Sequence, residues 1–433
     1  MKKLLSLLLA VLLAVSLFAA CGGEPAEQAP SETTYVSKFK SEGEFVTIND
    51  PVTWEKINSY PIKQAGMDIT EARQICVDFM RYSKTALWIP DDYYPIWSDA
   101  VLHTDGSTPD RSMDGGIIYG GLPYISWATG SIYRLMDYID ESTGVVNMER
   151  AGRVPLAFGN QCANGAYVGF ARVINSANYG VTATMVQSDG FLRLGDYTYS
   201  DVLTRYAEEY GTPHIIQENG DEVMYESYAQ LKAADGIVYW TTAGHVVLVA
   251  SDAVVVRDAN GKIDPAQSYI TVLDQTPTWK TATGAEGDQF TYQANVDEKW
   301  TFMKLLKGNY LPFTFAEWQG TDPIEETEVG VSHQGETITM QDVYKLKVTS
   351  NYYIMDLYLE VHDKWGNEVY KLASRPIKDA GVKEFRFFKN GENMDEWGSV
   401  DSLKAGGEYT AKIYMQLGTG ERPTLWEGKL IVE

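Results

Sequence analysis

The chain has 433 residues, too many for one ordinary hydrophobic core, so two folded units are expected. Hydrophobic residues make up 44% of the chain and aromatic residues 12%, which is enough to fill both cores. A formal net charge of -23 excludes nucleic acids and anionic lipid surfaces as partners, because both bind clustered Lys and Arg side chains.

The first 20 residues have the pattern of a secretory signal. Two lysines precede an apolar run from Leu4 to Ala20, which is short for a membrane span. The segment Phe18-Ala19-Ala20-Cys21 resembles the lipobox of bacterial lipoproteins, which implies that Cys21 is lipidated and becomes the new N-terminus. The alternative is a plain signal peptide cut near Ala20. Residues 21–36 are polar and contain prolines, so we expect a flexible tether there, with the lipid on Cys21 as the only membrane contact of an extracytoplasmic protein.

Residues 37–320 are predicted to form one α+β unit. Apolar side chains at helical spacing predict a helix over 70–82, with Cys76 on its buried face. The aromatic stretch 88–97 is punctuated by prolines and suggests a loop or the wall of a cleft. A second helix is predicted over 131–139.

Cys162 is the candidate nucleophile. It follows a loop containing Gly159 and Asn160 and begins a helix of small residues predicted over 162–176. A helix N-terminus has unpaired N–H groups and partial positive charge, which favour a thiolate and can hold an oxyanion. The first alternative is a buried apolar thiol, the usual state of a free cysteine. A disulfide with Cys76 is a second alternative, since pairing cannot be read from sequence.

Short strands are predicted over 237–240, 245–250, 253–256 and 269–273. His245 begins the second of them, directly after Gly244. This position holds an imidazole rigidly while leaving one side open, as a general base requires. The alternative is a structural histidine at a strand edge.

These motifs resemble those of the NlpC-type cell-wall peptidases and the related CHAP amidases of the papain-like superfamily. The resemblance covers roughly residues 115–280 and rests on Asn160-Gln161-Cys162, Leu231 to Trp240, Gly244-His245-Val246 and, upstream, Gly121-Leu122-Pro123-Tyr124. It implies a papain-like unit of helices plus an antiparallel sheet and a Cys162–His245 catalytic pair. No cofactor and no metal ion are expected.

The resemblance also implies that the group orienting the imidazole lies on the strand after the histidine strand. Asp274 ends the apolar part of that strand, and its carboxylate would fix the tautomer and stabilise the imidazolium. Gln275 is the fallback, and a polar strand end facing water is the alternative for Asp274. The expected oxyanion donors are the backbone N–H of Cys162 and the side chain of Gln161 or Tyr124.

An acidic linker at 320–326 leads to a second unit at 327–433, in which every predicted element is a strand. Several short strands between turns predict an all-β, immunoglobulin-like sandwich. It contains no catalytic constellation, so we expect it to bind or to act as a spacer.

The whole pattern predicts a surface-tethered cysteine peptidase or amidase that cleaves amide bonds through Cys162, His245 and Asp274. A location outside the membrane makes peptidoglycan stem peptides the expected substrate. The main alternative is a non-catalytic lipoprotein whose papain-like scaffold binds cell-wall glycopeptide or a protein partner, because Gln161-Cys162-Ala163 stands where the family has Asp-Cys-Ser. A solute-binding lipoprotein is disfavoured, since the all-β tail does not supply a second α/β lobe.

Overall fold

The computed structural model describes residues 47–92, 94–95, 112–125, 130–151, 159–177, 191–198, 211–241, 243–376, 381–387 and 394–432. The predicted signal segment, Cys21 and the tether at 21–36 lie outside these ranges. Within them, no helix has both the length and the apolar character that crossing a bilayer would take.

The larger part of the described chain is built on a ten-stranded mixed sheet with the order β5-β6-β1-β4-β11-β10-β9-β8-β12-β7. Its strands are β1 (Leu87–Pro90), β4 (Tyr119–Gly120), β5 (Ile139–Asp140), β6 (Val145–Val146), β7 (Phe191–Arg193), β8 (Gly236–Trp240), β9 (Gly244–Val249), β10 (Tyr269–Thr283), β11 (Gln289–Thr301) and β12 (Leu311–Phe315). The pairs β1–β6 and β4–β11 are parallel and the other pairs are antiparallel. A separate pair joins β2 (Tyr94–Pro95) and β3 (Ser112–Met113).

Helices accompany this sheet. They are α3 (Trp54–Ser59), α4 (Ile69–Thr85), α5 (Ile132–Leu135), α6 (Met148–Ala151), α7 (Cys162–Phe170), α9 (Thr212–Asn219), α10 (Asp221–Tyr228), α11 (Phe302–Lys307) and α12 (Ala316–Gln319). The Asp68 side chain caps α4 by accepting from the N–H groups of Thr70 and Glu71. Ala72, Cys76 and Met80 lie on its buried face, so the helix predicted over 70–82 is confirmed.

The cysteine helix α7 lies between α4 and the sheet, and all of its residues are buried. Glycines permit this close packing. A Cβ added to Gly169 would lie 3.0 Å from both Leu248 Cδ1 and Met80 Sδ. The predicted helix start at Cys162 is confirmed, although α7 ends at Phe170 instead of 176.

Three local predictions need correction. The helix predicted over 131–139 ends at Leu135, because Ile139 and Asp140 pair with β6. The stretch 88–97 is not simply a loop, since Trp88 lies in β1, is fully buried and donates from Nε1 to the Gly121 carbonyl at 2.7 Å. The strand predicted over 253–256 is reduced to a single bridge between Val254 and Tyr269.

A separate, mostly antiparallel sheet region forms the C-terminal part of the described chain. One sheet has the order β14-β21-β20-β16-β17-β19 and the other β13-β15-β18. The elements are β13 (Val329–Val331), β14 (Thr337–Thr339), α13 (Met340–Lys345), β15 (Lys347–Ser350), β16 (Ile354–Asp363), β17 (Glu368–Ser374), β18 (Glu384–Arg386), β19 (Met394–Trp397), a short 3-10 helix (Val400–Ser402), β20 (Tyr409–Leu417) and β21 (Thr424–Ile431). Helix α13, with a capping box between Thr339 and Asp342, corrects the expectation that every element here is a strand.

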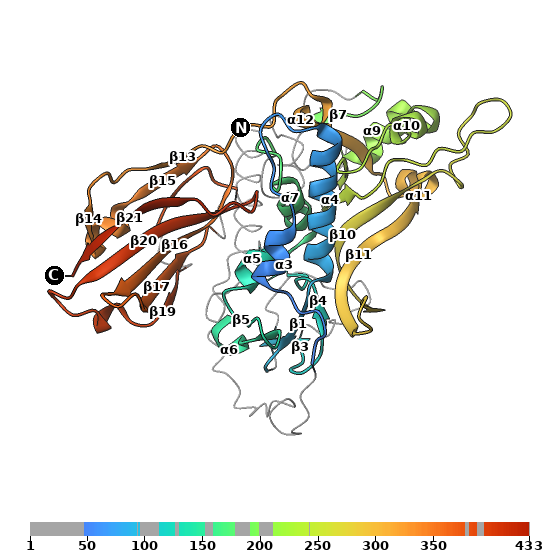
Figure 1. Cartoon of the computed structure of the whole chain (residues 1–433). Coiled ribbons are helices and arrows are strands. Elements are labelled where there is room, and N and C mark those ends of the chain that lie inside the picture. The colour runs from blue at the N-terminus through green and yellow to red at the C-terminus, as the bar shows by residue number, and fades with distance from the viewer. Residues whose placement is uncertain are drawn as a thin grey trace, which may run out of the picture.

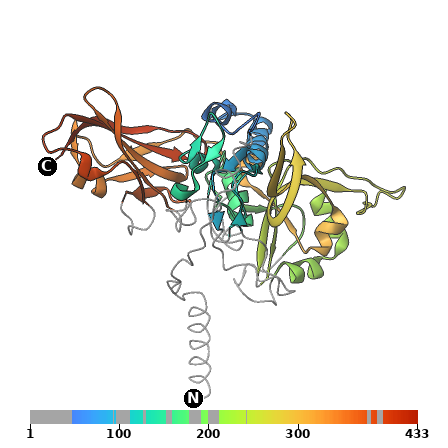
Figure 2. The same cartoon turned by 90° about the horizontal axis from the view of Figure 1, so that it is seen from below.

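Buried ion pairs join this C-terminal region to the segment around α5. Arg134 Nε donates to Asp356 Oδ1 at 2.8 Å, and Arg375 Nη2 lies 2.9 Å from Asp137 Oδ2. The Tyr358 hydroxyl also donates to Asp137 Oδ2, at 2.9 Å. Figures 1 and 2 show the C-terminal strands in orange and red on one side of α4 and the yellow β10–β11 hairpin on the other.

Candidate functional site

The structure brings Cys162, His245 and Asp274 together. Strands β9 and β10 are antiparallel neighbours, with Leu248 opposite Leu273, and α7 packs on both strands. His245 Nε2 lies 3.0 Å from Asp274 Oδ1. Cys162 Sγ donates to the Gly244 carbonyl at 3.8 Å, and the neighbouring His245 imidazole acts on the sulfur.

The surroundings of His245 favour its protonated form. Burial opposes a charge on the ring, but the Asp274 carboxylate, the hydrogen bond to it and the Cys162 sulfur together raise the His245 pKa to about 10. The side chain keeps 24% of its surface exposed, so the ring is accessible from one side.

The surroundings of Cys162 favour its thiolate. Burial raises the pKa of the thiol and Asp274 adds to this effect, but the hydrogen bond from His245, the charge on that ring and the Val246 backbone N–H outweigh both, so the pKa falls below its ordinary value. Cys162 is also the first residue of α7, where the partial positive charge of the helix acts in the same direction. The two shifts together describe a thiolate–imidazolium pair.

Asp274 is itself held in place. It is 3% exposed, and its Oδ2 accepts from Asn295 Nδ2 at 2.8 Å. Asn295 is the residue directly opposite Asp274 on β11, and its Oδ1 accepts from Lys280 Nζ. Asn295 was missed at the sequence level, because only the register of the β10–β11 hairpin reveals that it faces Asp274.

Tyr124 lies beside the sulfur, next to the start of α7. It forms a parallel bridge with Asn160, and its backbone N–H donates to Gln293 Oε1 at 2.7 Å. Its phenol interacts with the Cys162 sulfur. Burial and the charges of Cys162 and Asp274 raise the pKa of this phenol, so it remains a neutral donor at neutral pH. Gln161 is the N-cap residue of α7, adjacent to the nucleophile, and its side chain makes no capping hydrogen bond.

Gln275, the fallback for Asp274, is placed away from the imidazole contact. Its Nε2 donates to the Leu122 carbonyl at 3.0 Å and to the Gln293 carbonyl at 2.8 Å. Its Oε1 accepts from the ammonium group of Lys84. Both ends of the amide are thus used, while Asp274 makes the contact with His245. Lys84 was also missed at the sequence level.

An aromatic cluster lies beside the imidazole. The His245 and Tyr310 ring centroids are 6.2 Å apart in an edge-to-face arrangement. Tyr310 also packs against Trp300 and Tyr239, at centroid distances of 5.5 and 6.2 Å. These rings come from different elements, so no single stretch of sequence indicates the cluster.

Cys76 offers a contrast with Cys162. Both cysteines are free, so the alternative of a disulfide between them is not realised in the structure. Cys76 Sγ donates to the Gly169 carbonyl at 3.1 Å. Complete burial raises the pKa of this thiol to about 12, although the charges of Arg73 and Arg172 oppose the rise. Cys76 is therefore a packed core thiol, as its helical spacing predicted.

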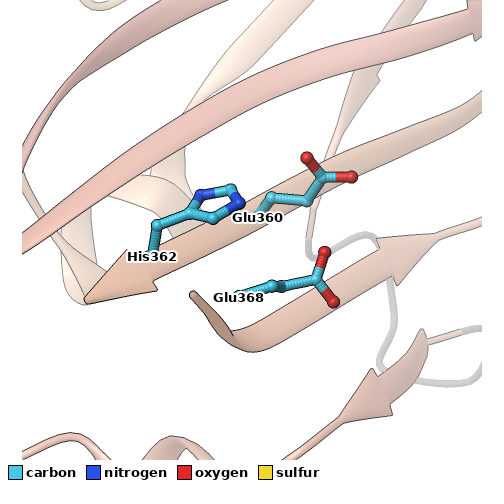
Figure 3. A group of neighbouring side chains, drawn as sticks. All are labelled: Glu360, His362 and Glu368. Carbon is cyan, nitrogen blue, oxygen red and sulfur yellow. The ribbon is translucent and has the colours of Figure 1, made fainter. Parts of the chain in front are cut away.

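One group with the chemistry of metal ligands lies in the described part of the C-terminal region. Figure 3 shows Glu360 and His362 on β16 and Glu368 on β17, with ligand atoms within 4.8 Å of one another. Glu360 Oε1, however, accepts from the Tyr414 hydroxyl at 2.7 Å and lies 3.9 Å from Lys371 Nζ. A lysine charge next to Glu360 disfavours a second cation there, and we assign no metal to the group.

No protein-family model, curated protein or solved structure matches this chain.

Proposed function

We propose that the protein is a cysteine peptidase or amidase that uses Cys162, His245 and Asp274 as a catalytic triad. The observation that carries the proposal is the placement of His245. Its Nε2 lies 3.0 Å from the buried Asp274 carboxylate, and the ring acts on the Cys162 sulfur at the start of α7, lowering the pKa of that thiol. A nucleophile, a base and a group that orients the base are the three parts that acyl transfer requires.

In this mechanism the Cys162 thiolate attacks an amide carbonyl carbon, and the π electrons of the C=O bond move to the oxygen. The backbone N–H of Cys162 and the Tyr124 hydroxyl are the donors for this oxyanion. The His245 imidazolium gives its proton to the leaving amine as the C–N bond breaks. Water then attacks the carbonyl carbon of the resulting thioester while neutral His245 accepts its proton, and the C–S bond breaks, which releases the acid and restores the Cys162 thiolate and the His245 imidazolium.

The finer fold assignments belong to the same proposal. We infer a papain-like, NlpC-type arrangement for the first unit, supported by a helix-borne cysteine packed against two neighbouring antiparallel strands that carry the histidine and the acid. We infer an immunoglobulin-like sandwich for the second unit, because buried residues of both its sheets, among them Val348, Phe385 and Leu359, share one core.

The expected substrate is the stem peptide of peptidoglycan. This part of the proposal rests on the resemblance to the NlpC-type enzymes and on the lipobox-like segment ending at Cys21, which would anchor the enzyme outside the bacterial membrane through its lipid. The aromatic cluster around Tyr310 places an apolar surface beside His245.

The test is incubation of the protein, produced without residues 1–21, with purified muropeptides, followed by mass spectrometry of the products. We expect amide cleavage that disappears in Cys162→Ala and persists in Cys76→Ser, the matched change at the buried thiol. Cleavage that survives Cys162→Ala would contradict the triad.

The second candidate is a non-catalytic binder of cell-wall glycopeptide or of a protein partner on the same scaffold. Gln161 and Ala163 flank the cysteine in place of the Asp and Ser of the family, and Cys162 is only 8% exposed. This candidate predicts that muropeptides bind without cleavage and that Cys162→Ala leaves their affinity unchanged.

A further inference from the structure

Lys84 is a buried cation in the last turn of α4, and the triad does not use it. It is 3% exposed. Its ammonium group donates to Gln275 Oε1, which lies next to Asp274 in the chain. It also lies against the first turns of α7, since a Cβ added to Gly165 would be 2.8 Å from Lys84 Nζ. The glycine leaves room for the ammonium beside the cysteine helix.

The groups that act on Lys84 come from two elements. Cys162 lies on α7, and Asp274 and Gln275 lie on β10. The negative charges of Asp274 and Cys162 both act on the Lys84 ammonium. Tyr124, on the segment before α5, stays neutral because burial and those same charges raise its pKa.

The net charge of the triad indicates the role of the Lys84 ammonium. With the proton on the sulfur, the triad is a neutral thiol, a neutral imidazole and a carboxylate. With the proton on His245, it is a thiolate, an imidazolium and a carboxylate. Either way the buried group carries one net negative charge, which is costly away from water unless a cation compensates it. Lys84 supplies that cation.

Burying this cation is costly, as it is for Lys63, whose pKa burial also lowers. Burial lowers the Lys84 pKa to about 8, even though Asp274 and Cys162 act to raise it. Coulomb attraction is mutual, so the charge that holds the proton on Lys84 also stabilises the sulfur as a thiolate.

We propose that Lys84 is a positioning residue of the site, which neutralises the triad and keeps the Cys162 sulfur anionic. This inference rests on the proposed function. During acyl transfer the negative charge passes from sulfur to the carbonyl oxygen, and a fixed cation behind the first turns of α7 offsets it in both positions. Lys84 acts on the nucleophile through its charge and does not touch substrate.

The test is the rate at which iodoacetamide alkylates Cys162, measured against pH by mass spectrometry of the peptide carrying it. The variants are Lys84→Gln, which still donates to Gln275 Oε1 without a charge, and Lys84→Met. In both we expect the midpoint of the rate profile to rise by about one pH unit or more, which is at least about tenfold slower alkylation below the midpoint. The rate on the alkaline plateau should stay within about twofold, because the sulfur itself is unchanged.

Lys63→Met is the matched control. Lys63 is also buried, at 4% exposed, but it donates to the Glu325 carbonyl at 2.9 Å and lies 3.8 Å from Glu421, outside the site. It should leave the Cys162 midpoint unchanged. Thermal unfolding checks that each variant is folded.

The outcomes separate this inference from the proposed function. A reactive wild-type Cys162 with an unshifted midpoint in folded Lys84→Gln would overturn the role of Lys84 and leave the triad standing. A shift of equal size in Lys63→Met would also overturn it, since the effect would then be general. A wild-type Cys162 that reacts no faster than Cys76 at mildly acidic pH would overturn the proposed function and this inference together.

Discussion

This protein contains two clusters of buried charged side chains, and the two clusters have different roles. At the junction with the C-terminal region, Arg134 and Arg375 face Asp137 and Asp356, with side chains at most 4% exposed. Guanidinium groups stay protonated at any physiological pH, so no proton moves there. The Arg375 and Lys371 charges and two hydrogen bonds overcome burial and hold the Asp137 pKa below its usual value.

At the candidate active site, the charges lie on groups that can gain or lose a proton. Cys162 has a lowered pKa, that of His245 is raised to about 10, and that of Lys84 is lowered to about 8. His245 also keeps an exposed side, whereas Arg375 has none. This difference shows that burial of charged groups alone does not identify an active site. The candidate active site is distinguished by titratable groups whose pKa values are shifted in opposite directions and by the solvent access of one of them, His245.

The largest expected effect is on turnover. Cys162→Ala should lower the rate of amide cleavage by at least about 10⁴-fold, because no other group can form the thioester. Its unfolding midpoint in urea should stay close to that of the wild type, since the side chain is small. Equal losses of rate in Cys162→Ala and Cys76→Ser would place the reaction elsewhere.

Asp274→Asn separates orientation from burial. The amide is nearly isosteric but carries no charge, so His245 loses the partner that raises its pKa and fixes its ring. We expect cleavage to fall by about 10³-fold and alkylation of Cys162 at pH 6 to slow. Asn295 contacts Asp274 and acts on the ring only through it, so Asn295→Ala should lower the cleavage rate by a smaller factor than Asp274→Asn does. A rate unchanged by Asp274→Asn would mean that the carboxylate is only a buried strand residue.

Arg375→Leu breaks the other cluster. Removing one partner leaves Asp137 buried without the guanidinium that neutralises it, so we expect a loss of about 3–5 kcal/mol in the free energy of unfolding. The alkylation rate of Cys162 in the folded variant should not change. Arg81→Ala is the control, because its pair with Asp297 is exposed and is worth less than about 1 kcal/mol. Equal losses in the two variants would contradict the role of burial.

The sequence predicted the local structure around Cys162 and His245 correctly, because neighbouring residues determine it. Cys162 follows a Gly and Asn loop and begins a helix, and His245 follows a glycine at a strand start, so each could be placed from its neighbours. Asp274 was placed by the resemblance and ends an apolar alternation, although β10 runs on to Thr283 because it pairs with β11.

The missed residues depend on tertiary structure. Lys84 stands in the last turn of an amphipathic helix, where a lysine ordinarily faces water and favours the helix dipole. Asn295 faces Asp274 only through the register of a hairpin with two irregularities. Neither position carries a local signal, and the strand order that brings β10 between β9 and β11 cannot be read from periodicity.

The smallest expected effect is a difference in how stability depends on pH. Between about pH 6.5 and 8, an unfolded Cys–His pair binds one proton, on the sulfur. The folded pair also binds one, on His245, because the two pKa shifts are opposite. Equal proton numbers mean that the pair adds no slope to the stability of the wild type in this window.

In Cys162→Ala, the free energy of unfolding should depend on pH in this window. His245 still faces Asp274, so its folded pKa stays above the unfolded value of 6.5, and the folded state now binds more protons than the unfolded chain. The stabilisation is complete below about pH 6.5 and is lost as the pH rises through the folded pKa. Relative to wild type, the unfolding free energy of Cys162→Ala should fall by up to about 1.4 kcal/mol per pH unit across the window. Urea unfolding at pH 6.5, 7.25 and 8 measures this, and Cys162→Ala combined with Asp274→Asn should remove the difference. Parallel curves for the wild type and Cys162→Ala would show that Asp274 does not raise the His245 pKa above its unfolded value.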